Sequence, residues 1–168
     1  MASRGTSARR WRCTARCGAS ATGDPHLRSL DQVAFDLQTL GEYRYLVPDP
    51  RDPEVTGPAL HVRHELYGHS GVTSIGGVAL DHGGHRVEAY VLPRPVVIVD
   101  GVEYAWSDKL ATSLAPDFAV ALGSHNLHLE ADGVTYTIAR YGFGTPYLNL
   151  WVDARAGMPL RGILGYSN

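Results

Sequence analysis

The segment "VALDHGGHRVEAYV" (residues 78–91) predicts a β-hairpin, and this hairpin indicates the fold class. Its centre, Gly83-Gly84, suits a two-residue turn, because glycine readily adopts the positive φ angles that such turns require. A turn of this length sets three cross-strand pairs: His82 with His85, Asp81 with Arg86, and Leu80 with Val87. The alternation predicts that Leu80 and Val87 face a core, whereas Asp81 and Arg86 pair on the solvent face.

Segments with the same features occur along the rest of the chain. "VVIVDGVEYAW" (96–106) and "NLHLEADGVTYTIARY" (126–141) predict hairpins that turn at the Asp-Gly pairs 100–101 and 132–133. Three further segments alternate between apolar and polar residues as half-buried strands do: "EYRYLV" (42–47), "ALHVRHELYG" (59–68) and "YLNLWV" (147–152).

Two segments interrupt this pattern. Residues 47–58 contain four prolines and predict a loop, and "SDKLATSLA" (107–115) is the one candidate helix. Short strands joined by tight turns at regular spacing are typical of sandwiches and barrels. The sequence therefore predicts an all-β fold, an antiparallel β-sandwich of hairpins with at most one short helix.

Charge and composition exclude some classes of function. The 168 residues carry a formal net charge of −2, so no global field draws the protein to nucleic acid. No segment approaches the roughly 20 apolar residues of a membrane span. Residues 1–22 form a basic N-terminal segment, predicted to be disordered, and residues 23–168 form one domain. No apolar stretch follows the N-terminal arginines, so no signal peptide is visible in this chain.

Cys13 and Cys17 are the two cysteines of the chain. With three residues between them, they can form a local disulfide bond, pair with another chain or stay reduced. Two thiols alone do not make a zinc site, which usually needs about four ligands.

Six of the eight histidines form His-x-x-His pairs, at 61/64, 82/85 and 125/128. On a strand, residues i and i+3 point to opposite faces, so the first and third pairs are poor chelates. The hairpin instead brings His82 and His85 together, which makes them a candidate surface metal site without an evident third ligand. The alternatives are a polar hairpin tip or a hydrolase that uses these two histidines. No nucleophile elbow, phosphate loop or HExxH motif supports an enzyme.

Both ends of the domain resemble the von Willebrand factor type D domain, in its cysteine-poor bacterial form. That family opens with Gly-Asp-Pro-His, followed by Thr-Phe-Asp-Gly, a Phe-Gln pair and Glu-x-Tyr-x-Leu. The corresponding residues here are Gly23-Asp24-Pro25-His26, Leu30-Asp31, Phe35-Asp36-Leu37-Gln38 and Gly41-Glu42-Tyr43-Arg44-Tyr45-Leu46. At the other end, "LRGILGYSN" (160–168) resembles the closing Cys-Gly-Leu-Cys-Gly-Asn segment. Between them, only the β pattern matches.

The resemblance implies a secreted, extracellular module with a structural or adhesive role and no enzymatic activity. Its partners would be other extracellular proteins or glycans. One alternative is a fragment of a larger secreted protein that has no function by itself.

The resemblance also implies a calcium site, formed where Asp31 meets the loop after the closing segment. Asp31 and Asn168 would each contribute oxygen ligands, but Ca²⁺ takes about six to eight, so the site is expected to be incomplete in this chain. The sequence departs from the family pattern at Gln32, where glycine is usual, and at Tyr166, where asparagine is usual.

The family's disulfide framework is absent. Tyr43, Arg161 and Leu164 occupy positions where the family has cysteine. We therefore expect the sheet core to stabilise this domain, and disulfide-linked polymerisation is not supported.

The Asp24-Pro25 bond offers a second function. Some members of the family cleave themselves at this bond, and by resemblance the Asp24 carboxylate attacks its own carbonyl group while Pro25 leaves. His26 would assist the proton transfer. The alternative is structural: Pro25 fixes the entry of the chain into the first strand, and His26 forms a hydrogen bond to a neighbouring loop.

Overall fold

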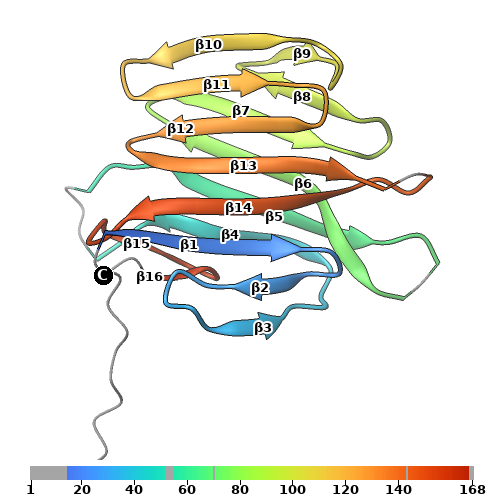
Figure 1. Ribbon diagram of the computed structural model, residues 1–168, viewed down its shortest axis with the longest axis horizontal. Helices are drawn as coiled ribbons and strands as arrows, with labels where there is room; N and C mark the ends of the chain where they lie inside the picture. The colour runs from blue at the N-terminus through green and yellow to red at the C-terminus, as the bar shows by residue number, and fades with distance from the viewer. Residues whose placement is uncertain (1–14, 52–54, 70, 143, 167–168) are drawn as a thin grey trace, which may run out of the picture.

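The fold is entirely β in the part of the chain that a computed structural model describes, residues 15–51, 55–69, 71–142 and 144–166. Sixteen strands and no helix occur in these residues. The strands pair antiparallel with their neighbours, and Figure 1 shows them in two layers. The predicted all-β class is confirmed.

Each layer contains eight of the described strands. The front layer in Figure 1 runs from top to bottom in the order β10 (Leu110–Ala115), β11 (Phe118–Leu122), β12 (Asn126–Ala131), β13 (Val134–Tyr141), β14 (Tyr147–Arg155), β1 (Arg16–Thr22), β2 (His26–Arg28) and β3 (Ala34–Asp36). The back layer has the order β9 (Val102–Tyr104), β8 (Val96–Val99), β7 (His85–Tyr90), β6 (Thr73–His82), β5 (Ala59–Leu66), β4 (Gly41–Pro48), β15 (Leu160–Gly162) and β16 (Gly165–Tyr166). The layers join where β14 pairs with β6 at Leu148 and Ile75.

The three predicted hairpins form with the predicted registers. Leu80 lies opposite Val87 across the Gly83-Gly84 turn, and the Asp100-Gly101 and Asp132-Gly133 turns close the other two. All six turn residues have positive φ angles, as a type I′ turn requires. The predicted ion pair on the solvent face also forms, with Arg86 Nη1 2.7 Å from Asp81 Oδ2.

The core lies between the two layers. It is formed by the side chains that point inward, at alternate positions along the strands. Its largest fully buried side chains are Trp106, Tyr45, Tyr136, Phe118, Leu30, Leu46, Leu60, Ile75, Leu80, Leu127, Leu129 and Ile138. Burial of apolar surface at this scale is the main favourable term in folding. No helix in the described residues is long and apolar enough to cross a membrane.

Two local predictions are wrong. The candidate helix at 107–115 is mostly strand β10, because Leu110–Ala115 pairs with β11 and completes the front layer. The segment 1–22 is not disordered throughout, because residues 16–22 form β1, which pairs with β14 on one side and β2 on the other. Cys17 lies in β1, is buried and is disulfide-bonded. Cys13 lies outside the described residues, so the local Cys13–Cys17 bond stays a prediction.

One polar pair is buried within the apolar core. The Tyr45 hydroxyl lies 2.6 Å from His64 Nε2, and His64 Nδ1 lies 3.2 Å from the main-chain oxygen of Thr39. A carbonyl oxygen only accepts, so Nδ1 carries the proton and Nε2 accepts from the tyrosine. Burial holds the pKa of His64 below its usual value, which keeps the ring neutral.

Acidification below about pH 6.5, the ordinary pKa of histidine, is expected to reduce the free energy of unfolding through His64. The unfolded chain then takes up a proton that folded His64 does not bind, and this uptake favours unfolding until the pH reaches the folded pKa. Thermal melting of wild type and His64→Gln from neutral to acidic pH measures the effect. The wild type should lose more stability across this range; equal losses in both proteins would contradict the assignment.

Candidate functional site

The Gly-Asp-Pro-His motif forms the turn between β1 and β2 at one end of the sandwich. Gly23 has a φ of 65°, and its N–H donates to Asn149 Oδ1 on β14 at 2.8 Å. Pro25 is buried, and its carbonyl oxygen accepts from the Leu37 N–H at 3.1 Å. The Asp24-Pro25 bond is therefore anchored on both sides.

His26 lies between two carboxylates. The β2–β3 hairpin pairs His26 with Asp36, and His26 Nδ1 lies 2.6 Å from Asp36 Oδ1. On the other side of the ring, Nε2 lies 3.0 Å from Asp24 Oδ1, a close contact that lacks hydrogen-bond alignment. The motif residues Asp24 and His26 are thus in contact, and their role in self-cleavage stays a prediction.

Asp36 is a site residue that sequence reasoning missed. Its signal was present, because a hairpin centred on residue 31 pairs position 26 with position 36. The hydrogen bond and the charge of Asp36 raise the pKa of His26 above its usual value, and Asp24 adds to this rise. His26 therefore keeps its proton to a higher pH than an isolated histidine.

The Asp24 carboxylate borders a cavity at this end of the molecule. Its Oδ1 is buried and accepts no hydrogen bond within the described part of the chain. The cavity measures about 210 Å³, and its lining consists of Gly23, Asp24, Tyr67, Val72, Thr73, Ser74 and Tyr147. A carboxylate with an unsolvated oxygen is a better nucleophile than one that is fully hydrated.

The closing segment folds against the opening segment. The Leu30 N–H donates to the Leu164 carbonyl oxygen at 2.7 Å, and the Leu164 N–H donates to the Tyr45 carbonyl oxygen at 3.0 Å. Asp31 Oδ1 approaches Gly165 so closely that a Cβ atom there would lie 2.6 Å from it. The two segments that carry the resemblance therefore meet in the structure, although the contacting residues Asp31 and Gly165 lie 134 positions apart in the sequence.

Gln32, which stands where the family pattern has glycine, keeps the backbone conformation of a glycine. Its φ is 66°, in the left-handed region that glycine adopts without strain. The Gln32 side chain donates from Nε2 to the Gly18 carbonyl oxygen at 2.9 Å. This hydrogen bond to β1 offsets part of the roughly 1–2 kcal/mol that the left-handed conformation costs a non-glycine residue.

The predicted calcium ligands are only partly described. Asp31 is exposed and accepts a hydrogen bond from the Ser29 hydroxyl at 2.5 Å, so its carboxylate is available at the surface. Asn168 lies outside the described residues. Among the residues that are described, no group of three or more His, Cys, Asp or Glu side chains could hold a metal ion. Asp31 is the one predicted ligand that lies within the described residues, and the calcium site stays a prediction.

His82 and His85 face each other as predicted, but each contacts an aspartate. His82 Nε2 lies 3.0 Å from Asp117 Oδ2, and His85 Nδ1 lies 2.8 Å from Asp100 Oδ2. The bond from His82 lowers the pKa of Asp117. Both imidazole rings also form T-shaped contacts with the ring of Phe118. A metal ion on either of these two nitrogens would have to displace an aspartate.

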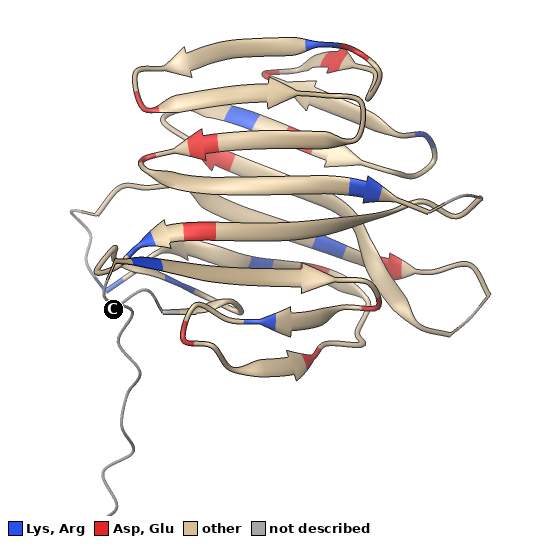
Figure 2. Cartoon of the chain, viewed as in Figure 1, with Lys and Arg blue, Asp and Glu red and all other residues tan. Residues whose placement is uncertain are grey.

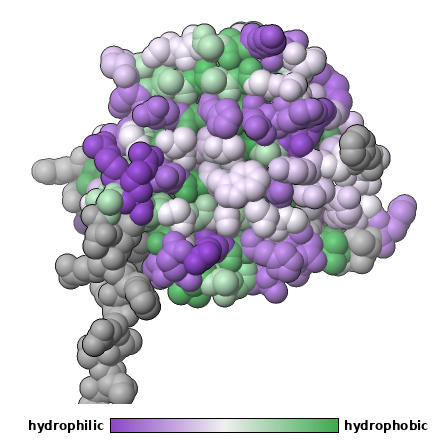
Figure 3. Space-filling view, in the orientation of Figure 1, coloured by the Kyte–Doolittle hydropathy of each residue, from purple (hydrophilic) through white to green (hydrophobic). Residues whose placement is uncertain are grey.

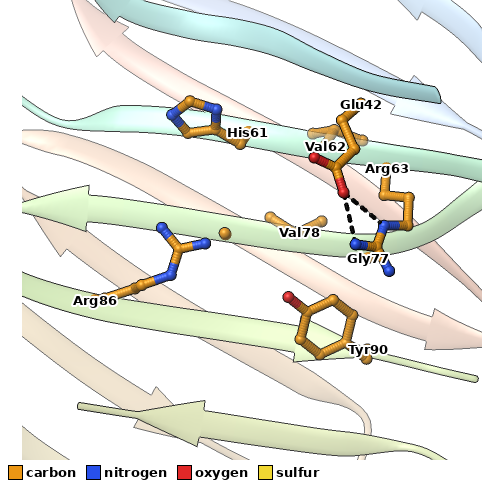
Figure 4. Close-up of a pocket in the computed structure, with 9 residues that line it drawn as sticks. Glu42, His61, Val62, Arg63, Gly77, Val78, Arg86 and Tyr90 are labelled. Atoms are coloured by element: carbon orange, nitrogen blue, oxygen red, sulfur yellow. Dashed lines mark hydrogen bonds and ion pairs between the residues drawn. The ribbon is translucent and has the colours of Figure 1, made fainter. Parts of the chain in front are cut away.

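A shallow pocket lies on the outer face of the back layer (Figure 4). Glu42 accepts hydrogen bonds from Arg63 at 3.0 and 2.5 Å. Arg86 donates to Asp81 and also to Glu88, which it contacts at 2.9 Å. Both guanidinium groups are therefore neutralised by neighbouring carboxylates, and the pocket offers an anionic ligand little net attraction.

A scan against protein-family models finds no matching family, and no curated protein matches the sequence. Function therefore has to be inferred from the motifs and the geometry of the chain itself.

Proposed function

We propose that this chain is an extracellular structural or adhesive binding module of the von Willebrand factor type D kind, stabilised by calcium. The observation that supports the proposal is the contact between the opening and closing segments. Asp31 and Gly165 meet, and the Leu30–Leu164 hydrogen bond holds the segments in register. A module of this kind has to close its sheet core through these two segments, because the framework cysteines are replaced.

Calcium would act at this junction. The Asp31 carboxylate is the ligand that the described residues supply, and its charge is the type that Ca²⁺ prefers. A cation there would neutralise Asp31 where it approaches the backbone of Gly165, and so tie the closing segment to the opening turn. The stabilisation should therefore appear in the thermal stability of the whole domain.

Addition of calcium is expected to raise the melting temperature of the wild type and to leave that of Asp31→Asn unchanged. At a calcium concentration about 100-fold above its Kd, binding adds about 2.7 kcal/mol, or about 5–10 °C for a domain of this size. Differential scanning fluorimetry with and without calcium measures the shift. Glu103→Gln, an exposed carboxylate on β9, is the control and should respond as the wild type does. An Asp31→Asn variant that responds fully to calcium would count against the proposal.

A second candidate function is self-processing at Asp24-Pro25, and the position of His26 between Asp24 and Asp36 favours it. The Asp24 carboxylate would attack its own main-chain carbonyl carbon and form a cyclic anhydride. The bond to the Pro25 nitrogen breaks, and that nitrogen takes a proton from His26. Water then opens the anhydride and leaves a carboxyl-terminal aspartate. His26 suits the role of acid because Asp36 keeps it protonated in mildly acidic solution.

A further inference from the structure

The outer face of the front layer carries a row of polar side chains around an exposed tryptophan. Cross-strand pairing aligns five positions over five neighbouring strands: His128, Thr137, Trp151, Ser20 and Arg28. Residues paired in this way share one face of a sheet. Trp151 is 37 % exposed and lies at the centre of the row.

The neighbours of Trp151 leave a hollow beside it. Ser20 and Thr137 on the adjacent strands are small, and a Cβ atom on Gly18 would meet no atom within 4 Å. The hollow is about 450 Å³, and its lining includes Ser20, Arg28, Gln32, Thr135, Thr137 and Trp151. Figure 3 shows this face as a central area of intermediate hydropathy with strongly hydrophilic groups around it.

The charges around the hollow favour an anionic ligand. Arg16 Nε lies 2.6 Å from Asp153 Oδ1, so this pair is neutralised within the protein. Arg28 is exposed, and its guanidinium group has no ion pair or hydrogen bond to any other described residue. Basic and acidic residues are otherwise interspersed over this face (Figure 2). The guanidinium of Arg28 can therefore bind a carboxylate through two parallel hydrogen bonds.

The composition of the hollow also indicates the class of ligand. The core of a protein–protein interface is apolar and poor in charged residues, whereas here one aromatic ring lies among hydroxyl, amide and charged groups. A saccharide matches this arrangement, since its ring has an apolar C–H face that stacks on an aromatic ring and hydroxyl groups around its edge.

We propose that this face binds a saccharide that carries a carboxylate group. The sugar ring stacks on Trp151. The hydroxyl groups of Thr135 and Thr137 form hydrogen bonds with those of the sugar, and Arg28 pairs with its carboxylate. The inference names the ligand class of the binding module and rests on that proposed function. Its test measures saccharide affinity and not the response to calcium, so the two proposals can fail separately.

Isothermal titration calorimetry with trigalacturonate, a hyaluronan hexasaccharide and sialyllactose tests the proposal, with lactose as the uncharged counterpart of sialyllactose. The wild type should bind at least one carboxylated probe. Trp151→Ala should weaken that binding about tenfold or more, the loss typical of an aromatic anchor. Arg28→Gln should weaken it about tenfold and remove its salt dependence. Tyr141→Ala and Arg44→Gln, exposed residues outside the hollow, should bind as the wild type does.

Three results would overturn the proposal. The first is that none of the carboxylated probes binds. The second is that binding persists unchanged in both Trp151→Ala and Arg28→Gln. The third is wild-type self-association that depends on Trp151 in sedimentation and occurs without saccharide binding, because the face would then belong to a second copy of the chain. If Trp151→Ala unfolds, Trp151→Tyr and Arg28→Gln carry the test, and Trp151→Tyr should retain part of the affinity.

Discussion

Replacement of Gly162 by alanine is expected to lower the free energy of unfolding by about 2–4 kcal/mol. Gly162 ends β15 with a φ of 154°, and it lies directly on the main chain of β4. A Cβ atom would lie 2.7 Å from the Tyr45 carbonyl carbon and closer still to its oxygen. Neither atom can rotate away, because both belong to the backbone of a strand in the core. Urea unfolding of the two proteins measures the difference.

Gly18→Ala is the matched control for this prediction. Gly18 lies in β1, and a Cβ atom there would meet open space. Its substitution is therefore expected to change stability by less than about 1 kcal/mol. If Gly162→Ala is as stable as Gly18→Ala, the closing segment does not pack on β4 as described. The junction between the opening and closing segments would then lose its structural basis.

Self-processing is expected to slow by about 100-fold or more when His26 is replaced by alanine, the loss typical of a missing general acid. Asp24→Ala should abolish the reaction, because the attacking carboxylate is gone. The protein is incubated at mildly acidic pH, and its intact mass is then measured under denaturing conditions. The wild type should be cleaved between residues 24 and 25. His128→Ala, an exposed histidine on β12, is the control and should react at the wild-type rate.

Asp36 supplies a finer test of the same mechanism. Because Asp36 raises the pKa of His26, Asp36→Asn should lower that pKa and move the pH profile of the reaction to lower pH. A merely structural role for Asp36 would change the rate without moving the profile. A wild-type chain that stays whole for days, or an Asp24→Ala chain that divides as fast as the wild type, would contradict self-processing.

The sequence predicted the hairpins best because their signals are local. A two-residue turn fixes the register of its strands, so the pairs around Gly83-Gly84 and Asp132-Gly133 followed from turn chemistry alone. Strand β1 was missed because its pairing with β14 is not local: Ala19 lies opposite Val152. β10 was assigned to a helix for a similar reason, since a short segment without clear alternation is placed by its sheet neighbour.

The candidate site shows the same limit. Asp24, Pro25 and His26 were found because they are contiguous and match a motif. Asp36 could have been found from the hairpin that pairs it with His26, but that hairpin has no Asp-Gly or Gly-Gly signal at its turn. The approach of Gly165 to Asp31 depends on the whole sandwich between them, and only the resemblance of both ends suggested it. The Trp151 row likewise exists only after four separate pairings align β12, β13, β14, β1 and β2.

The position of β1 determines what a cut at Asp24-Pro25 would do. The strand ends two residues before that bond and lies between β14 and β2, with six register pairs to β14 alone. Cleavage of the chain would thus leave the N-terminal piece as a separate polypeptide that is held in the sheet by the pairing of β1 with β14 and β2. The product would be a noncovalent two-chain complex of the same native size, heavier than the intact chain only by the one water molecule that hydrolysis adds. Whatever the N-terminal piece is attached to would then stay linked to the domain through strand pairing, and it would be released only when the sandwich opens.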